Sequence, residues 1–515
     1  MRKRRLWAAV LMVSMLALTA CGGKSDGGTD GTDGSGSSSG QSAAGQTAAG
    51  QTAAEGKQEA AEAITFLTKD YYIMPEMADM LSEQFKEKTG AELKISHVPN
   101  NNWEEKITAT FVSGSMPDIA RLPADVYPFV KQDFLVPLDE YIEGNPEVKA
   151  VLDANPEVLK PYQFFGKTYG MSITNQKYMA MWVRTDWLDQ LGISMPTNME
   201  ELENMLVLFR DKDLDGNGKQ DTIPLTLSAV LKDQDMFAAS FGTRNEVFMK
   251  DGKAVVPFTS GDYKNYMDYM KHLYAEKLID LEMPTNTSYG AVRTKFINSE
   301  AGSIIMWDDI YDTLKLGLEK GGMTDASLEY IDPYKTDKGV FGMSYYEADS
   351  PIGITSQCKD PKKAFDTFFT WFLTDPDAII STSRGVEGYS FDVVDGVCVP
   401  NMDNNGVGFR GQSFPPINTA FEYPFTFDDI TAKEYDSITT LAELGKSFGA
   451  SVVTEMPAKE FSSYYNVKGD LTAKATELYH NYVLGNITYE EYLNNFNKYS
   501  AEIGLDGIIA EINKR

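Results

Sequence analysis

The stretch AITFLTKDYYIMPEMADMLSEQFKEKTGAELKISHV, residues 63–98, decides the fold of this chain. Branched and aromatic residues predict a short strand over Ala63–Thr68. Apolar residues at helical spacing predict a helix over Pro75–Thr89, which Gly90 ends. A second strand is predicted over Glu92–Val98. Because a strand, a helix and a second strand in this order are typical of a βαβ unit, the sequence predicts an α/β fold with a parallel sheet.

The alternation of strands and helices continues downstream. A helix is predicted over Trp103–Val112, Ser113–Ser115 interrupts it, and Pro117–Ala120 begins another short strand. Further helices are predicted over Asp186–Leu191, Asn198–Phe209, Tyr263–Glu276, Pro361–Phe372 and several segments from Ala432 onward. We therefore expect a sheet with helices on both faces and a mostly helical C-terminal third. The roughly 450 residues after Ile64 suggest two or three structural domains.

The N-terminus carries the pattern of an export signal. Arg2–Arg5 precede the apolar run Leu6–Leu18, and small residues lead to Cys21. This pattern predicts a signal peptide, residues 1–20, that is cleaved before Cys21. The alternative, an uncleaved membrane helix, would need a longer apolar run. Cys21 would become the lipid-modified first residue, and its acyl chains would hold the protein in the lipid bilayer on the extracytoplasmic face of the cell membrane.

Residues 21–61 predict a tether behind this anchor. After Cys21 they consist almost wholly of Gly, Ser, Thr, Ala, Gln and Asp, with no aromatic and no branched apolar residue. Such a segment cannot bury a core and behaves as a flexible coil. The globular part would then stand clear of the membrane.

The composition excludes several classes of function. Against 47 basic residues stand 75 acidic ones, for a net charge of −28, so nucleic acid is a poor partner. The three histidines form no HExxH motif, which leaves zinc hydrolysis without a ligand set. Cys358 and Cys398 can pair in an oxidising compartment, but no spacing pattern supports a bridge, and we expect two buried free thiols.

The most specific local pattern is DKDLDGNGKQDT, residues 211–222. Oxygen-bearing side chains on alternate positions of a tight turn can converge on calcium, and Gly216 and Gly218 permit the turn. Two registers are open, and the one that starts at Asp211 ends on Thr222, where a bidentate Glu is expected. We favour the other register, whose ligands are Asp213, Asp215, Asn217, the Lys219 carbonyl and Asp221. The alternative is that these residues only form turns. A Ca²⁺ ion here would be structural, since no catalytic group lies nearby in sequence.

The chain as a whole resembles the family 1 extracellular solute-binding proteins, the lipoprotein receptors of ABC importers for sugars. The resemblance covers nearly all of Ile64–Arg515. It rests on ordered segments, which are Ser113–Ile119 (SGSMPDI), Gly166–Gly170 (GKTYG), Arg184–Ile193 (RTDWLDQLGI), the acidic loop with Ile223–Leu225, Leu273–Ile279 (LYAEKLI), Ala301–Gly302 before Trp307, and Arg384–Gly388 (RGVEG). Each segment alone is weakly specific, whereas their order is strongly so.

The resemblance implies a two-lobed, periplasmic-binding-protein-like fold of type II, with discontinuous lobes that close on a ligand about a hinge. It implies an N-terminal lobe of residues 62–172 plus about 305–350, and a C-terminal lobe of 173–304 plus about 351–515. The chain would cross between lobes near Gly170–Asn175, Ile304–Asp308 and Ser350–Ile354. A monomer that delivers its ligand to ABC permease subunits is expected.

The acidic loop is similar to the calcium site of alginate-oligosaccharide receptors in this family, which supports the register that starts at Asp213. Those receptors place Glu directly after the last Asp, whereas this chain has Thr222. One carboxylate ligand is therefore missing.

Trp307 is the leading candidate for a sugar contact. A sugar ring offers apolar faces and a rim of hydroxyls, so its site needs an aromatic plate beside hydrogen-bonding groups. Trp307 follows the apolar run Ser303–Met306 and precedes Asp308, which places it at the end of a strand with an acceptor beside it. It also matches the tryptophan that stacks on sugar in maltose-binding relatives.

Other candidates follow strands, where open sheets present their ligand sites, or occupy a glycine-bounded loop, and Trp182 and Tyr178 alternate on a strand near an expected crossing between lobes. They are Asp308, Trp182, Tyr178, Tyr72, Arg121, Asp125, Arg384, Glu387 and Tyr389. For Trp182 and Tyr178 a packing role is equally compatible with the pattern.

Three functions remain in view. The first is a lipid-anchored receptor that binds an oligosaccharide without turnover. The second is a secreted glycoside hydrolase with an Asp/Glu pair, although adjacent acids arise by chance in so acidic a chain. The third is a receptor for a peptide or another non-sugar solute, which would show apolar pockets in place of aromatic plates.

Overall fold

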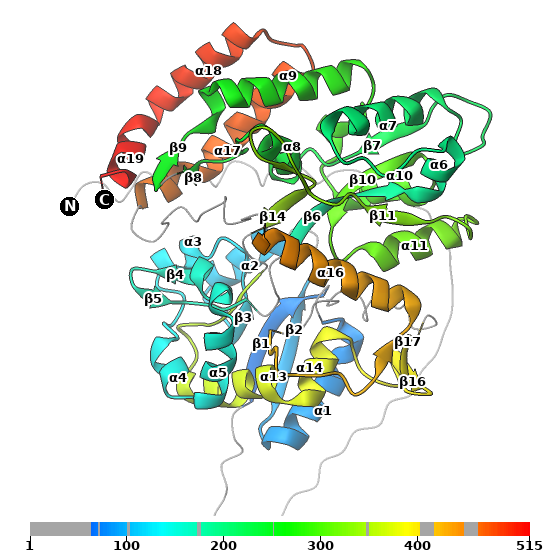
Figure 1. Cartoon of the computed structure of the whole chain (residues 1–515). Helices are drawn as coiled ribbons and strands as arrows, with labels where there is room; N and C mark the ends of the chain where they lie inside the picture. The colour runs from blue at the N-terminus through cyan, green and yellow to red at the C-terminus, as the bar shows by residue number, and fades with distance from the viewer. Residues whose placement is uncertain are drawn as a thin grey trace, which may run out of the picture. The chain divides into compact units, whose positions relative to one another are not determined.

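The computed structural model describes residues 63–70, 73–99, 103–172, 177–250, 252–346, 350–401, 417–447 and 462–514 (Figure 1). All of them belong to one compact unit, Ala60–Arg515. The expected signal peptide, Cys21, the tether and Tyr72 lie outside the described residues. Among the described helices, none is long and apolar enough to cross a membrane.

The opening βαβ unit forms as the sequence predicts. β1 (Ile64–Lys69) and β2 (Leu93–Val98) lie parallel, with Ile64 opposite Leu93. A 3-10 turn (Pro75–Met77) leads from β1 into α1 (Ala78–Thr89). This helix ends because Gly90 has a φ of 72°, a left-handed conformation that favours a residue without Cβ.

Two further strands complete the first sheet, whose order is β15-β3-β1-β2. β3 (Ile119–Arg121) is parallel to β1, and β15 (Ile352–Ile354) is antiparallel to β3. Successive residues Phe66 and Leu67 of β1 belong to two different apolar clusters, so both faces of the sheet are covered, as predicted. The face that carries Phe66 packs on α1, α5 (Pro146–Ala154), a π-helix (Phe365–Phe369), α13 (Thr370–Thr374) and α14 (Pro376–Ser383). The face that carries Leu67 packs on α2 (Trp103–Val112) and α3 (Tyr127–Lys131).

The second sheet is mixed rather than parallel. Its order is β11-β6-β10-β7, with β14 also paired to β6. β7 (Ile223–Thr226) is parallel to β10 (Ala301–Trp307), whereas β6 (Lys177–Arg184) is antiparallel to β10, to β11 (Leu328–Tyr330) and to β14 (Met343–Tyr346). The prediction of a parallel sheet is therefore confirmed for β2, β1 and β3 of the first sheet, to which β15 adds an antiparallel edge, and it is wrong for the second sheet.

These pairings also correct the expected lobe boundaries. Residues 305–350 were assigned to the first lobe, yet β10, α11 (Tyr311–Lys320), β11 and β14 all belong to the second sheet and its core. Residues after 351 were assigned to the second lobe, yet β15 completes the first sheet. No crossing occurs at residues 304–308, because β10 pairs with β6 along its length. Of the described residues, the first lobe thus contains those within 63–70, 73–99, 103–172, 350–401 and 417–427, and the second lobe those within 177–250, 252–346 and 462–514.

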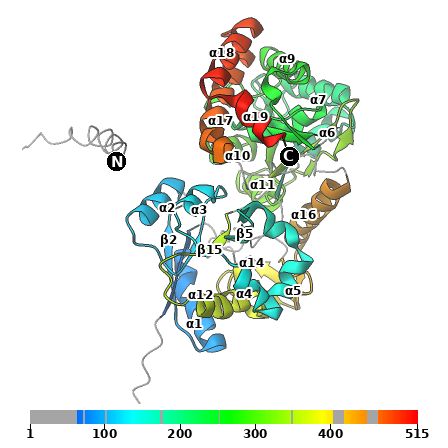
Figure 2. The same cartoon turned by 90° about the vertical axis from the view of Figure 1, so that its left-hand side faces the viewer.

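The second lobe carries most of the helices. Those before the C-terminal part are α6 (Thr185–Leu191), α7 (Met199–Asp211), the 3-10 turn η4 (Leu231–Gln234), α8 (Asp235–Ser240), α9 (Gly261–Ala275) and α10 (Tyr289–Ile297). The C-terminal part is helical, as predicted: α17 (Ser462–Val483) lies beside α9, and α18 (Tyr489–Glu502) and α19 (Leu505–Ile512) pack on α17 (Figures 1 and 2). Helix α16 (Asp429–Ser447) contacts α11 and β6 as well as the short strand β18 (Thr426–Phe427).

Short elements complete the two lobes. They are α4 (Asp139–Glu143) and α12 (Pro361–Ala364), and the paired strands β4 (Gln163–Phe164) and β5 (Lys167–Thr168), β8 (Phe248–Lys250) and β9 (Lys253–Val255), β12 (Tyr334–Lys335) and β13 (Val340–Phe341), and β16 (Phe391–Val394) and β17 (Val397–Pro400). Cys398 on β17 is buried and Cys358 half-buried, and both are free, as predicted. Burial raises the pKa of each thiol to about 12, so both stay protonated near neutral pH.

Two segments that carry the family resemblance are explained by packing in the second lobe. The Arg184 guanidinium donates two hydrogen bonds of 2.8 and 2.6 Å to the Asp186 carboxylate and lies 4.9 Å over the Trp187 ring. A Cβ on Gly302 would stand 2.6 Å from the same ring and 2.4 Å from Phe209. Glycine is therefore required where β10 passes these two rings.

Candidate ligand-binding site

Trp307 is the last residue of β10 and remains partly exposed. Its backbone carbonyl accepts a hydrogen bond of 3.0 Å from the Trp182 indole N–H. Its ring meets the Tyr289 ring at 5.6 Å between centroids and an interplanar angle of 62°, an edge-to-face arrangement. The ring is thus supported from its own lobe while part of its surface stays open.

Three other candidates next to Trp307 in the sheet are buried, namely Asp308, Tyr178 and Trp182. The Asp308 N–H donates to the Tyr178 carbonyl at 2.9 Å, and the Asp308 carboxylate accepts the Tyr178 N–H at 3.1 Å. All three residues are at most 1% exposed. Burial, together with the charge of Asp308, raises the pKa of Tyr178 to about 12. These candidates fasten the start of β6 to the end of β10 and offer no surface to a ligand in this structure.

The first-lobe candidates Arg121 and Asp125 are separated by burial. Arg121 ends β3, is 1% exposed and donates to the Ser350 carbonyl at 3.3 Å, so it holds the chain where it re-enters the first sheet. Asp125 is exposed and accepts the Tyr127 N–H at 3.2 Å at the start of α3. With Glu104 and Phe129 among its neighbours, Asp125 lines a hollow of about 160 Å³.

Arg384, Glu387 and Tyr389 lie at a separate place, just after α14. The Arg384 guanidinium is 1% exposed and sits in an aromatic box, 4.6 Å from the Phe427 ring, 5.5 Å from Tyr435 and 5.6 Å from Tyr423. Glu387 is exposed, and Tyr389 packs against the first-lobe core. Arg384 therefore joins α14 to the segment that leads into α16.

The acidic loop after α7 brings its oxygen-bearing side chains together. The Asn217 amide donates to Asp215 at 2.7 Å and to Asp221 at 3.0 Å, and the Gly218 N–H donates to Asp213 at 2.9 Å. Partial burial and the neighbouring Asp213 and Asp221 raise the pKa of Asp215, as expected where carboxylates converge.

The glycines of this loop behave as the sequence predicts, because Gly216 and Gly218 have φ values of 73° and 80°. Within the described ranges, no three His, Cys, Asp or Glu side chains are arranged to hold a metal ion. The Asn217 amide stands between the carboxylates instead. The donor set nevertheless suits a hard cation, since it consists of carboxylate and amide oxygens on a glycine-rich turn.

The loop lies far from Trp307. β7 follows the loop and pairs with β10 so that Ile223 is opposite Ala301, whereas Trp307 is at the other end of β10. At a rise of roughly 3.3 Å per residue, β10 separates the two by about 20 Å. An ion in the loop would support the lobe and would not touch a ligand on Trp307.

A buried chain of hydrogen bonds, which the sequence did not reveal, links η4 to the C-terminal helices. The Tyr479 hydroxyl donates to Gln234 at 2.6 Å, the Tyr266 hydroxyl donates to Tyr479 at 3.2 Å, and the Asn245 amide donates to Tyr266 at 3.3 Å. Tyr263 and Tyr266 lie three residues apart on α9, a spacing that signals a buried face but not its hydrogen-bond partners. The candidates likewise do not include Tyr289, which contacts the Trp307 ring, or Asp233 and Ser228, which hydrogen bonds link to Tyr289.

The family of bacterial extracellular solute-binding proteins matches residues 67–379, more than half of the chain. The chain belongs to this family. Lipoprotein LipO of Bacillus subtilis is 26% identical over 331 residues, which are 62% of this chain and 65% of LipO. The polygalacturonan/rhamnogalacturonan-binding protein YtcQ of Bacillus subtilis is 25% identical over 313 residues, 58% of this chain and 57% of YtcQ. This solute-binding protein thus aligns with less than two thirds of the length of these curated relatives.

Solved structures of similar fold cover more of the molecule. An HMO-binding, ABC-transporter-associated solute-binding protein from Bifidobacterium longum infantis has a TM-score of 0.66 at 18% identity, over 88% of this chain and 98% of that chain. The substrate-binding protein FusA of Streptococcus pneumoniae, in complex with kestose, has a TM-score of 0.65 at 17% identity, again over 88% and 98%. An alginate-binding protein without calcium ion has a TM-score of 0.63 at 19% identity, also over 88% and 98%. The predicted two-lobed fold of this solute-binding protein is confirmed.

Proposed function

We propose that this protein is a lipid-anchored extracellular receptor that captures an oligosaccharide between its two lobes and delivers it to an ABC importer without chemical turnover. The partly exposed Trp307 carries the proposal. It offers a flat apolar surface at the carboxyl end of β10, held by an edge-to-face contact with Tyr289. A flat aromatic surface of this kind covers the apolar face of a sugar ring.

The similar proteins support a sugar as the ligand class. The FusA structure contains kestose, and YtcQ is named for binding polygalacturonan and rhamnogalacturonan. These ligands differ in charge, so both neutral and acidic sugars belong in a test.

The test is a thermal-shift and calorimetric screen of the purified protein against kestose, maltotriose, a galacturonate trisaccharide and an alginate trisaccharide. A sugar present at a hundred times its Kd should add about 2.7 kcal/mol to the free energy of unfolding. The sugar should be recovered unchanged afterwards. Consumption of the sugar would indicate a glycoside hydrolase, and stabilisation by peptides but by no sugar would indicate a different receptor.

Substitution of Trp307 tests the surface itself. Trp307→Ala should weaken binding of a stabilising sugar by about 1 to 2 kcal/mol, and Trp307→Phe should recover part of the loss because it restores an aromatic plate. Phe165→Ala is the matched control, since Phe165 is a 57% exposed aromatic residue of the first lobe. Equal effects of the two alanine variants would contradict a specific role for Trp307.

We propose in addition that Cys21 anchors the protein to the membrane. Its position after Leu18-Thr19-Ala20 supports lipid attachment. In cells, Cys21→Ser should move the protein from the membrane fraction to the medium. Persistence of this variant in the membrane fraction would point to an uncleaved signal helix.

We further propose that the loop after α7 binds a structural Ca²⁺ ion through Asp213, Asp215, Asn217, the Lys219 carbonyl and Asp221. The convergence of Asp215 with Asp213 and Asp221 supports this, as does an EF-hand mutant among the similar FusA structures. Terbium luminescence should detect an ion, and calcium should raise the melting temperature. Asp215→Asn should abolish both effects, whereas Asp211→Asn, outside the ligand set, should not. Luminescence retained in the Asp215 variant would exclude this ligand set.

A further inference from the structure

Tyr289 contacts the Trp307 ring and is in turn hydrogen-bonded to Asp233, so two further elements of the second lobe are linked to Trp307. Tyr289 is the first residue of α10, and Asp233 belongs to η4. We propose that Tyr289 and Asp233 are positioning residues, which fix the plane of the Trp307 ring for the ligand. This inference rests on the proposed role of Trp307 as the sugar-binding surface.

Tyr289 links the Trp307 ring to a hydrogen bond. Its ring packs edge-to-face on Trp307 at 5.6 Å, and its hydroxyl donates to Asp233 Oδ1 at 3.2 Å. An edge-to-face pair has a preferred angle, so rotation of one ring disturbs the other. Because the hydroxyl of Tyr289 is held at the far end, the Tyr289 ring cannot follow if Trp307 turns.

Asp233 is itself held on both carboxylate oxygens. Oδ1 accepts the Tyr289 hydroxyl, and Oδ2 accepts the hydroxyl of Ser228. The Ser228 hydroxyl oxygen also accepts the Val230 N–H at 3.1 Å, which fixes the direction of the serine. Asp233 is fully buried, and a buried carboxylate is costly unless it is well hydrogen-bonded. Hydrogen bonds therefore connect three side chains into a chain that ends at the Trp307 ring, and we call this chain the relay. It consists of Ser228, Asp233 and Tyr289.

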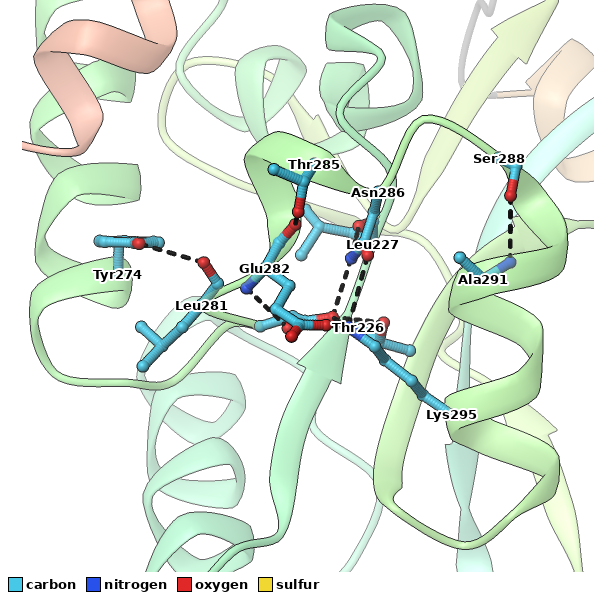
Figure 3. A network of polar contacts seen from close by, with 11 residues as sticks. Thr226, Leu227, Tyr274, Leu281, Glu282, Thr285, Asn286, Ser288, Ala291 and Lys295 are labelled. Carbon is cyan, nitrogen blue, oxygen red and sulfur yellow. Dashed lines mark hydrogen bonds and ion pairs between the residues drawn. The ribbon is translucent and has the colours of Figure 1, made fainter. Parts of the chain in front are cut away.

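A second polar network, at the end of β7, holds the segment that leads into α10 and so supports the relay (Figure 3). Asp280 Oδ2 accepts from the Thr226 hydroxyl at 3.0 Å, the Asn286 amide at 2.8 Å and the Lys295 ammonium group at 2.6 Å. The Asn286 amide also donates to the Leu227 carbonyl at 3.1 Å. These bonds tie the segment before α10 to β7, so α10 begins at a fixed point.

The Ser288 hydroxyl completes this start, because it accepts the Ala291 N–H at 3.3 Å and caps the helix (Figure 3). Tyr289 follows directly. The Tyr289 ring is thus attached to a rigid element. A side chain must be held in this way if it is to position a neighbouring ring to within a fraction of an ångström.

A ligand-free measurement tests the relay. The intact protein labelled with 5-fluorotryptophan should show one ¹⁹F resonance that disappears in Trp307→Phe and so belongs to Trp307. Tyr289→Phe, which keeps the ring and removes only the hydroxyl, should shift or broaden this resonance, and Asp233→Asn should do the same. Tyr274→Phe is the matched control, since the Tyr274 hydroxyl donates to the Leu281 carbonyl at 3.1 Å in the same lobe. An unchanged Trp307 resonance in Tyr289→Phe would overturn the proposal.

A double-mutant cycle then relates the relay to binding, with kestose or whichever of the four screened trisaccharides stabilises the protein as the probe. Tyr289→Phe should raise the Kd three- to tenfold in the native background and leave it unchanged in the Trp307→Ala background. An equal loss in both backgrounds would overturn the proposal, because Tyr289 would then act independently of Trp307. If Trp307→Ala leaves the Kd of every probe unchanged while the ¹⁹F shift persists, the proposed sugar-binding surface fails and the relay stands as a structural one.

Discussion

The two lobes hold their interiors together by different means. In the first lobe, aromatic rings without polar partners pack on one another, with Phe368 at 5.0 Å from Phe66 and 6.0 Å from Trp371. In the second lobe, buried tyrosines are joined by directional hydrogen bonds, as between Tyr266 and Tyr479. Aromatic packing stabilises a core, but small displacements of the rings cost little free energy. A hydrogen bond, in contrast, weakens steeply when its angle departs from the preferred one. The tyrosine cluster of the second lobe is therefore the one of these two clusters whose geometry is fixed by direction.

The largest expected effect concerns the packed core. Phe368→Ala should lower the free energy of unfolding by about 3 to 5 kcal/mol, because Phe368 is fully buried and the cavity would not collapse completely. Urea denaturation followed by circular dichroism measures it. Phe368→Leu, which keeps most of the volume, should cost far less. A loss below about 1 kcal/mol in the alanine variant would show that this core repacks freely.

The second prediction uses a buried acid of the polar core. Burial raises the pKa of Asp235 from its ordinary 3.8 to about 6, against the attraction of Arg244, whose Nη1 lies 3.5 Å from its carboxylate. Because the folded protein holds this proton more tightly than the unfolded chain does, the contribution of Asp235 to stability falls as pH rises from about 4 to about 6. The fall should be at most about 3 kcal/mol.

Denaturation at several pH values compares the native protein with Asp235→Asn. The difference in stability between the two should change over this pH window, and Phe368→Ala should show no such pH-dependent difference. A difference that is constant with pH would mean that Asp235 does not hold a proton in the folded state.

A smaller effect is expected from a single hydroxyl of the polar core. Tyr479→Phe removes the 2.6 Å hydrogen bond that the Gln234 side-chain carbonyl accepts. The free energy of unfolding should fall by about 1 to 2 kcal/mol, because the buried carbonyl loses its donor. Tyr274→Phe removes a hydroxyl at an exposed hydrogen bond and should cost little. Thermal denaturation of the two variants under one condition measures both losses of stability. Equal losses would remove the distinction between the polar core and the surface.

The smallest effect should come from a contact between α3 of the first lobe and α17 of the second. The Tyr465 ring of α17 lies 4.7 Å from the Tyr127 ring of α3, and Lys131 donates to Asn466 at 2.7 Å. Tyr465→Ala should weaken sugar binding by less than about 1 kcal/mol, since the contact favours this arrangement of the lobes without touching a ligand. Calorimetry measures the change, with Phe165→Ala as a neighbouring control. A larger loss of stability than of affinity would place Tyr465 in the core instead.

The fold was predictable where local pattern and tertiary pairing agree. The β1–α1–β2 unit satisfies both, because its helix ends at Gly90 and its strands are neighbours in the sheet. β10 shows why the lobe boundaries failed. Residues Ala301 to Met306 are all buried, so the strand is apolar on both faces and its sequence suits the centre of either sheet.

The candidate site was predictable only in part, for a related reason. Position at a strand end selected Trp307 and Asp308, and alternation on a strand near an expected crossing selected Trp182 and Tyr178. Of these four residues only Trp307 remains partly exposed. The sequence next to an aromatic or charged residue at a strand end does not indicate whether a neighbouring strand will cover that side chain. Arg384 illustrates the same limit, because its aromatic box is completed by Phe427 and Tyr435, about 40 and 50 residues away in sequence. The acidic loop was predictable because its geometry is set by its own residues.

The placement of the whole relay on one lobe has a kinetic consequence. Ser228, Asp233, Tyr289 and Trp307 all precede residue 346 and belong to the second lobe. If Trp307 is the sugar-binding surface proposed above, a ligand can meet the second lobe before the first lobe closes on it. Changes in the second lobe should then alter mainly the association rate constant, and changes in the first lobe mainly the dissociation rate constant.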